Sequence, residues 1–200
     1  YNVGIGTNAL KNYTGAGGSN NNVAIGWQSQ GASSGAVASN NVSIGYDSLR
    51  ANTASNYTAI GHQAGLSNTS GTGMCAVGYT ALTISTGNNN TALGHSAGNG
   101  ITSGTDNLCI GYNTDVVATG NNQIAIGSGV TTLNANEIRL GNTSNTSTIL
   151  QGSVSLGSNT TADASALIDL TSTAKGALLP RMTTTQKNAI SSPATGLTLY

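Results

Sequence analysis

The sequence repeats a short pattern in which an aliphatic residue stands directly before a glycine, and no other feature constrains the fold as strongly. Successive glycines of this pattern are 20, 19, 16, 17, 16, 17, 16, 14 and 16 residues apart. A regular period of this length indicates a solenoid, in which each repeat adds one coil to a stack. The ten copies are Ile5-Gly6, Ile25-Gly26, Ile44-Gly45, Ile60-Gly61, Val77-Gly78, Leu93-Gly94, Ile110-Gly111, Ile126-Gly127, Leu140-Gly141 and Leu156-Gly157.

Each copy alternates apolar, small and apolar residues ahead of its glycine, as in Asn22-Val23-Ala24-Ile25-Gly26. This alternation predicts a short strand with one buried face. We expect the aliphatic residues to fill the core and the small residue to lie on the other face, so Ile60→Asp should disrupt its coil. The asparagine is expected to turn the chain into the strand, and the glycine to bend it out again. Arg139 is the exception at the small position.

The rest of each period is rich in Ser, Thr, Asn and Gly, with a second small or aliphatic position. We interpret one period as one coil that contains a strand, a turn, a second short strand and a return loop. The sequence therefore predicts an all-β, parallel β-solenoid of about ten coils over residues 1–158, with neighbouring strands about 4.8 Å apart. The longer first periods indicate loop insertions at residues 15–19 and 31–35. Such a thin core favours association with further copies.

The balance of charges argues against several partners. The formal net charge is zero and only 6% of the residues are charged, with six basic residues scattered along the chain. A nucleic-acid partner is not expected, because binding to phosphates needs Lys and Arg. No stretch approaches the roughly 20 apolar residues of a membrane helix, so we expect no membrane insertion. Because the chain begins at Tyr1 rather than Met, we expect a fragment of a longer protein.

The two cysteines, Cys75 and Cys109, stand at different positions of the repeat. One lies three residues before its glycine and the other lies two, so their side chains are expected on opposite faces of their strands. They also lie two repeats apart, which corresponds to about 9–10 Å. A disulfide between them is therefore not expected, and both are predicted to be free, buried or half-buried thiols.

The residue directly after the glycine carries a ring in six successive copies. In a solenoid these side chains would form a ladder along one face. Its function is open between a binding strip for carbohydrate, an ion site at the histidines, and structural stacking between coils or at a subunit interface. The two imidazoles are expected about 10 Å apart, too far to share one zinc ion within a chain. The six candidate binding residues are Trp27, Tyr46, His62, Tyr79, His95 and Tyr112.

These repeats resemble the head repeats of trimeric autotransporter adhesins, which run as Asn-x-Val-Ala-Ile-Gly followed by a Ser- or Ala-rich return. The same repeat occurs in bacteriophage tail fibres and related virion appendages. The resemblance covers about residues 1–158, and it implies a left-handed parallel β-roll and a homotrimer in which three rolls pack side by side. The matching copies are Asn22-Val23-Ala24-Ile25-Gly26, Asn41-Val42-Ser43-Ile44-Gly45 and Tyr57-Thr58-Ala59-Ile60-Gly61-His62.

Residues 159–200 differ in composition and are expected to connect the repeats to a further C-terminal domain. We predict a strand over residues 163–170, a short helix that Thr183 or Thr184 caps and that reaches about Ile190, and a final strand over residues 197–200. The Lys-Gly-aliphatic-Leu-x-Pro-Arg-Met-Thr pattern around Pro180 resembles a segment of phage tail fibres and large secreted surface proteins. There it commonly precedes a C-terminal domain, which in tail fibres can be a self-cleaving chaperone.

The sequence shows no motif of an enzyme. It has no Gly-x-Ser-x-Gly elbow and no phosphate loop. Asp106 and Asp115 flank one coil and could approach each other, but two acids on turns are more often solvated. The repeats also lack the Gly-Gly-x-Gly-x-Asp signature of calcium-binding rolls. We therefore predict no catalytic residues, no cofactor and no metal site.

These observations predict a fibrous structural protein, namely the shaft or head of a trimeric phage tail fibre or similar virion appendage involved in host-surface attachment. Expected partners are two further copies of the chain, other virion or fibre proteins, and a glycan or protein receptor on the host. The expected location is the virion. Two alternatives are open, a trimeric adhesin of the bacterial cell surface and a polysaccharide-degrading spike.

Overall fold

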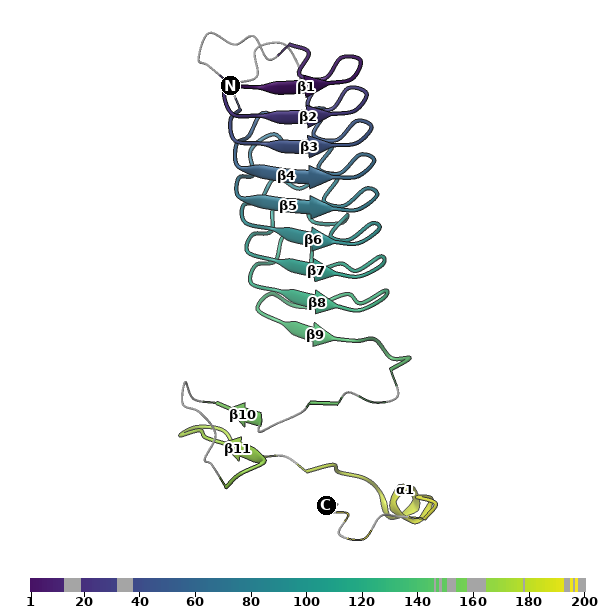
Figure 1. Cartoon of the computed structure of the whole chain (residues 1–200). Coiled ribbons are helices and arrows are strands. Elements are labelled where there is room, and N and C mark those ends of the chain that lie inside the picture. Colours follow the sequence, from purple (N-terminus) through teal and green to yellow (C-terminus); the bar gives the residue numbers. More distant parts are fainter. Residues whose placement is uncertain are drawn as a thin grey trace. The chain divides into compact units, whose positions relative to one another are not determined.

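The computed structural model describes residues 1–12, 19–31, 38–145, 147, 149–150, 154–157, 165–177, 179–192, 195 and 197. The chain forms two compact units, Tyr1–Thr146 and Ser147–Tyr200. The first unit is a parallel β-solenoid, here called the roll (Figure 1). The two predicted loop insertions fall largely on residues 13–18 and 32–37, outside the described residues.

Among the described residues of the roll, nine strands stack in chain order into one parallel sheet. Each strand ends directly before the glycine of its repeat, as the alternating pattern predicts, and equivalent positions pair side by side in neighbouring strands. The predicted all-β parallel solenoid is therefore confirmed. The strands are β1 (Val3–Ile5), β2 (Val23–Ile25), β3 (Val42–Ile44), β4 (Tyr57–Ile60), β5 (Met74–Val77), β6 (Thr91–Leu93), β7 (Leu108–Ile110), β8 (Ile124–Ile126) and β9 (Ile138–Leu140).

The prediction of which strand face is buried is wrong. The small middle residue, such as Ala59 or Ala92, is fully buried, whereas the aliphatic residues beside it point outward. Ile60 is 38% exposed and Leu93 is 49% exposed. The inside of the roll is narrow because the chain turns back directly after the glycine. A second column of small residues then packs against the first, and these residues are Ser29, Ser48, Ala64, Ala81 and Ala97.

Larger apolar side chains fill the wider part of the roll, beyond the paired small residues. This cluster includes Leu49, Tyr57, Leu82, Ile101 and Val130. The predicted second strand of each coil is not formed here, and outside the named strands the described residues show one isolated bridge, between Asp115 and Thr131. Turns stacked by backbone hydrogen bonds replace it, for example from the Leu82 N–H to the Ala97 carbonyl at 3.1 Å.

The glycine after each strand is required by two separate features. Its φ angle is +137° at Gly61 and +140° at Gly78, a region that is strained for residues with a side chain. A Cβ atom added at Gly61 would also collide with the carbonyl group of Gly78 in the next coil. The glycine therefore bends the chain, as predicted, and it also allows the coils to approach closely.

The asparagine four residues before the glycine does not serve as the turn residue. Asn22, Asn41, Asn90 and Asn107 are buried, and we call them the asparagine ladder. The Asn107 Oδ1 atom accepts from the Gln123 N–H at 3.0 Å, and its amide nitrogen donates to the Gly120 carbonyl at 2.9 Å. Each ladder residue thus links its coil to the next.

The residue ahead of the ladder takes the left-handed backbone conformation instead. Asn21 and Asn40 both have a φ angle of +60°, which asparagine tolerates better than most residues. Asparagine therefore does turn the chain ahead of the strand, but the turn residue is the asparagine one position before the predicted one.

The two cysteines are free and lie in different columns of the sheet. Cys75 is half-buried among the outward residues, whereas Cys109 is buried between Ala92 and Ala125 in the inner column. Burial raises the pKa of both thiols, to about 12 for Cys109. Thiols of this kind stay protonated and are poor nucleophiles.

The C-terminal unit has little structure of its own (Figure 1). The tenth copy of the repeat forms β10 (Val154–Leu156), which pairs in parallel with β11 (Ile168–Leu170) and not with β9. Helix α1 (Thr184–Asn188) begins with the predicted cap, where Thr183 and Gln186 form a capping box. None of the described residues of this unit is buried, and no helix in the described part of the chain is long and apolar enough to cross a membrane.

Candidate functional site

The six predicted binding residues lie together as one continuous stack, here called the ring ladder. Each ring follows the glycine of its coil, and parallel pairing places each ring beside the next one. The first four pairs are stacked, with interplanar angles of 8–19°, and the last pair is tilted at 36°. The centroid distances are 4.7 Å for Trp27–Tyr46, 5.0 Å for Tyr46–His62, 5.0 Å for His62–Tyr79, 4.8 Å for Tyr79–His95 and 5.2 Å for His95–Tyr112.

Stacking determines which parts of the rings a ligand can reach. Each of the four inner rings has another ring against both of its faces, so a sugar has no free face there to stack on. Tyr46 and Tyr79 nevertheless remain 45% and 48% exposed. Their hydroxyl groups form no hydrogen bond to any residue that the structure describes. The accessible part of the ladder is therefore a row of ring edges.

The two histidines do not converge on a common ion. Tyr79 lies between His62 and His95 in the stack, as expected from the sequence. His95 Nδ1 lies 3.0 Å from the Ser96 hydroxyl. Among the described residues, no group of three or more His, Cys, Asp or Glu side chains is arranged to hold a metal ion.

The two acids considered for catalysis are both held by their own surroundings. Asp106 accepts from the Asn89 side chain at 3.0 Å and from the Thr105 hydroxyl at 2.8 Å, and these hydrogen bonds lower its pKa. Asp115 accepts from the backbone N–H groups of Gly100 and Val116, each at 2.9 Å, while its partial burial raises its pKa. Both carboxylates thus form hydrogen bonds to neighbouring residues of the roll.

A second candidate surface was not expected from the sequence. Two columns of outward residues run along the nine strands of the described roll, and we call them the outer face. One column contains Val23, Val42 and Leu108, and the other contains Ile60 and Leu93, with few polar interruptions. The alternation of the sequence was the available signal, but it does not say which of the two strand faces is solvent-exposed.

One family comparison identifies the C-terminal end of the chain. Residues 155–200 match the family model of the phage tail-like trimerisation region. This match and the β-solenoid together fit a phage tail-fibre-like protein. This match supports a trimer, and together with the parallel solenoid it fits a structural fibre. No curated protein and no solved structure matched the chain.

Proposed function

We propose that this chain is a structural segment of a phage tail fibre, or of a similar virion appendage, that takes part in attachment to the host surface. The observation that carries the proposal is the trimerisation-region match, which follows a stack of parallel coils along the same chain. The phage tail-like character of the match favours a virion appendage over a bacterial surface adhesin.

A second copy of the same chain is the proposed occupant of the outer face. Soluble monomers rarely expose a contiguous apolar patch larger than a few hundred Å². Nine strands about 4.8 Å apart present an aliphatic strip about 40 Å long. The trimerisation-region match supports identical copies as the partner, because such a region would bring three rolls into one particle. Three outer faces in contact would bury the strip that each chain leaves exposed.

The mass of the full chain in solution tests this assembly. Sedimentation equilibrium should give three chain masses. Ile60→Asp should weaken the association and leave the coil folded, because Ile60 points outward. Asn99→Asp adds the same charge at an exposed turn and should leave the mass unchanged. A wild-type monomer would refute the trimer, and an unfolded Ile60→Asp variant would refute the outward role of this residue.

We further propose the ring ladder as the surface that contacts the receptor, with an extended, uncharged glycan as the ligand. The ring edges offer one polar group per coil at a regular spacing of 4.7–5.2 Å, which suits a polymer with regularly placed hydroxyl groups. The surroundings carry little charge, since the described segment 38–112 contains only Asp47, Arg50 and Asp106 as charged residues. Three ladders in one trimer would act together, so individually weak contacts would suffice.

Replacement of tyrosine hydroxyl groups tests the proposed edge contacts. The triple variant Tyr46→Phe, Tyr79→Phe and Tyr112→Phe retains the stack and removes three edge hydroxyls. It should lose binding to an array of neutral bacterial surface polysaccharides, whereas Tyr57→Phe, at a buried tyrosine, should retain it. Equal binding by both variants would contradict the proposed edge contacts. Release of oligosaccharides during incubation would instead indicate a polysaccharide-degrading spike.

A further inference from the structure

The last coil of the roll breaks the repeat at two positions. Arg139 occupies the inward position that holds a small residue in the other strands of the sheet, and it pairs with the buried Ala125. Glu137 occupies the position of the asparagine ladder, one coil after Gln123. Both substitutions place a charged side chain where the preceding coils have uncharged ones.

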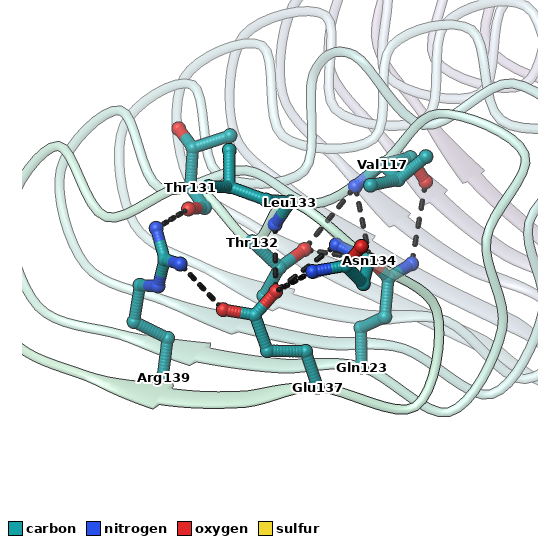
Figure 2. A network of polar contacts seen from close by, with 8 residues as sticks. All are labelled: Val117, Gln123, Thr131, Thr132, Leu133, Asn134, Glu137 and Arg139. Atoms are coloured by element: carbon teal, nitrogen blue, oxygen red, sulfur yellow. Dashed lines mark hydrogen bonds and ion pairs between the residues drawn. The ribbon is translucent and has the colours of Figure 1, made fainter.

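The two charged residues bind each other and the end of their own coil (Figure 2). Arg139 Nη1 donates to the Thr131 carbonyl at 2.6 Å, and Nη2 lies 2.6 Å from Glu137 Oε1. Glu137 Oε2 accepts from the backbone N–H groups of Leu133 at 2.8 Å and Asn134 at 3.0 Å. These hydrogen bonds, that of Leu133 foremost, lower the pKa of Glu137, and Arg139 adds to the effect.

The asparagine ladder also ends at this point. In the preceding coil, Asn107 Oδ1 accepts the N–H group of Gln123 and so reaches forward to the next strand. Gln123 Oε1 instead accepts from the Thr132 hydroxyl at 2.6 Å and from the Val117 N–H at 3.1 Å (Figure 2). The Gln123 side chain thus bonds to its own coil and to the preceding coil, and does not reach forward to β9 as Asn107 reaches forward to β8.

We propose that Glu137 and Arg139 cap the roll and keep the free edge of β9 from pairing with a further coil, including β1 of another copy. Among the described residues, β9 and β1 each have a neighbouring strand on one side only, and such edges are templates for pairing with another chain. An added coil would cover the ion pair and remove it from water, which is costly for charged groups. An inward-pointing charge on an edge strand is a known protection against this kind of association.

The variant Arg139→Ala separates the cap from a mere irregularity of the repeat. The variant restores the small residue found in the other strands. If Arg139 were only an irregularity of the repeat, the variant should therefore be as stable as the wild type or more stable. The cap predicts the opposite, because the Thr131 carbonyl and Glu137 lose their partner. Amide exchange at Leu133 and Asn134 should become about tenfold faster or more. Sedimentation should also show species larger than the wild-type assembly, in an amount that rises with concentration.

Two further variants keep this test decisive. Arg50→Ala removes the arginine of the other ion pair in the described roll, with Asp47, and should change neither the exchange at Leu133 nor the mass. Arg139→Lys retains the charge and should largely restore the wild-type mass. Unchanged exchange in Arg139→Ala would overturn the cap. Faster exchange without larger species would overturn the claim that the pair keeps β9 unpaired.

Discussion

The roll and the C-terminal unit differ in how much apolar surface they bury within one chain. The roll contains fully buried side chains of its own, among them Leu49, Leu82 and Ile101. The C-terminal unit has no buried residue among those described, and Leu156, Ile168 and Leu170 are all more than half exposed. The lack of buried residues in the described part of this unit agrees with its match to a trimerisation region, because a small unit that buries little surface needs a partner to fold stably.

The same contrast exists on a smaller scale within the roll. Apart from Arg139, the inward middle residues of the strands are small and pack within one chain, whereas the outward aliphatic residues beside them are larger and half-buried or exposed. One side of each strand therefore packs inside its own chain, and the other side is available for contact with neighbouring chains.

The largest expected effect is at the glycine column of the roll. Gly61→Ala should destabilise the roll by at least about 3 kcal/mol, because an alanine there is strained and collides with the Gly78 carbonyl. Thermal unfolding measures this change. Gly129→Ala is the matched control, since its φ angle is +61° and no atom lies within 4 Å of the added Cβ, so its cost should be about 1 kcal/mol. Similar losses in the two variants would contradict the close approach of the coils.

A smaller effect is expected from a charge in the C-terminal unit. Leu170→Asp should lower the association free energy by about 2 kcal/mol or more, because Leu170 would lie in the contact between chains. Sedimentation should show fewer trimers at low concentration, while the circular dichroism of the roll stays the same. Loss of the roll signal in step with the trimer would show that the two units do not fold separately.

The asparagine ladder provides a test confined to the roll. Asn107→Ala removes the acceptor of the Gln123 N–H and the donor to the Gly120 carbonyl, both inside the stack. The loss of stability should be about 2 kcal/mol, because buried polar groups stay unpaired. Asn99→Ala, at an exposed turn, should cost little. A small effect of Asn107→Ala in thermal unfolding would mean that water molecules replace the hydrogen bonds of the Asn107 side chain.

The smallest expected effect concerns pH. Burial raises the pKa of Asp115 in the folded roll, so the folded state holds its proton more tightly than the unfolded chain does. The contribution of Asp115 to stability should therefore fall as the pH rises through the interval between its unfolded and folded pKa values, upward from about 4. Asp115→Asn should remove this slope in melting temperatures recorded from pH 3 to 7. Asp169→Asn in the C-terminal unit should not remove it.

Much of the fold was predictable from the sequence because a glycine at a regular spacing marks every strand end. The pattern located all nine strands of the described roll and the ring ladder. It did not identify the buried face, since alternation distinguishes two faces without saying which is inside. The inside could be inferred only from the width of the coil, which depends on how soon the chain turns back after Gly61 or Gly78.

The candidate sites were predictable to different degrees. Six rings at one repeat position were sufficient to predict a ladder, but not that stacking would cover the ring faces. Arg139 was visible as an exception in the repeat, yet its role depends on contacts with Thr131 and Glu137 that only the structure shows. The receptor contact itself stays a prediction.

The register of the sheet has a consequence for how such a chain can change its length. Neighbouring strands of the roll pair equivalent repeat positions, and from Gly6 to Gly127 the glycine after each strand lies against the glycine of the next coil. A segment from one glycine to the next, such as the 16 residues that end at Gly94, is therefore an interchangeable module. Recombination between repeats would lengthen or shorten the stack by whole coils and keep the register of the sheet and the contacts between glycines. The length of the roll is thus set by the number of repeats.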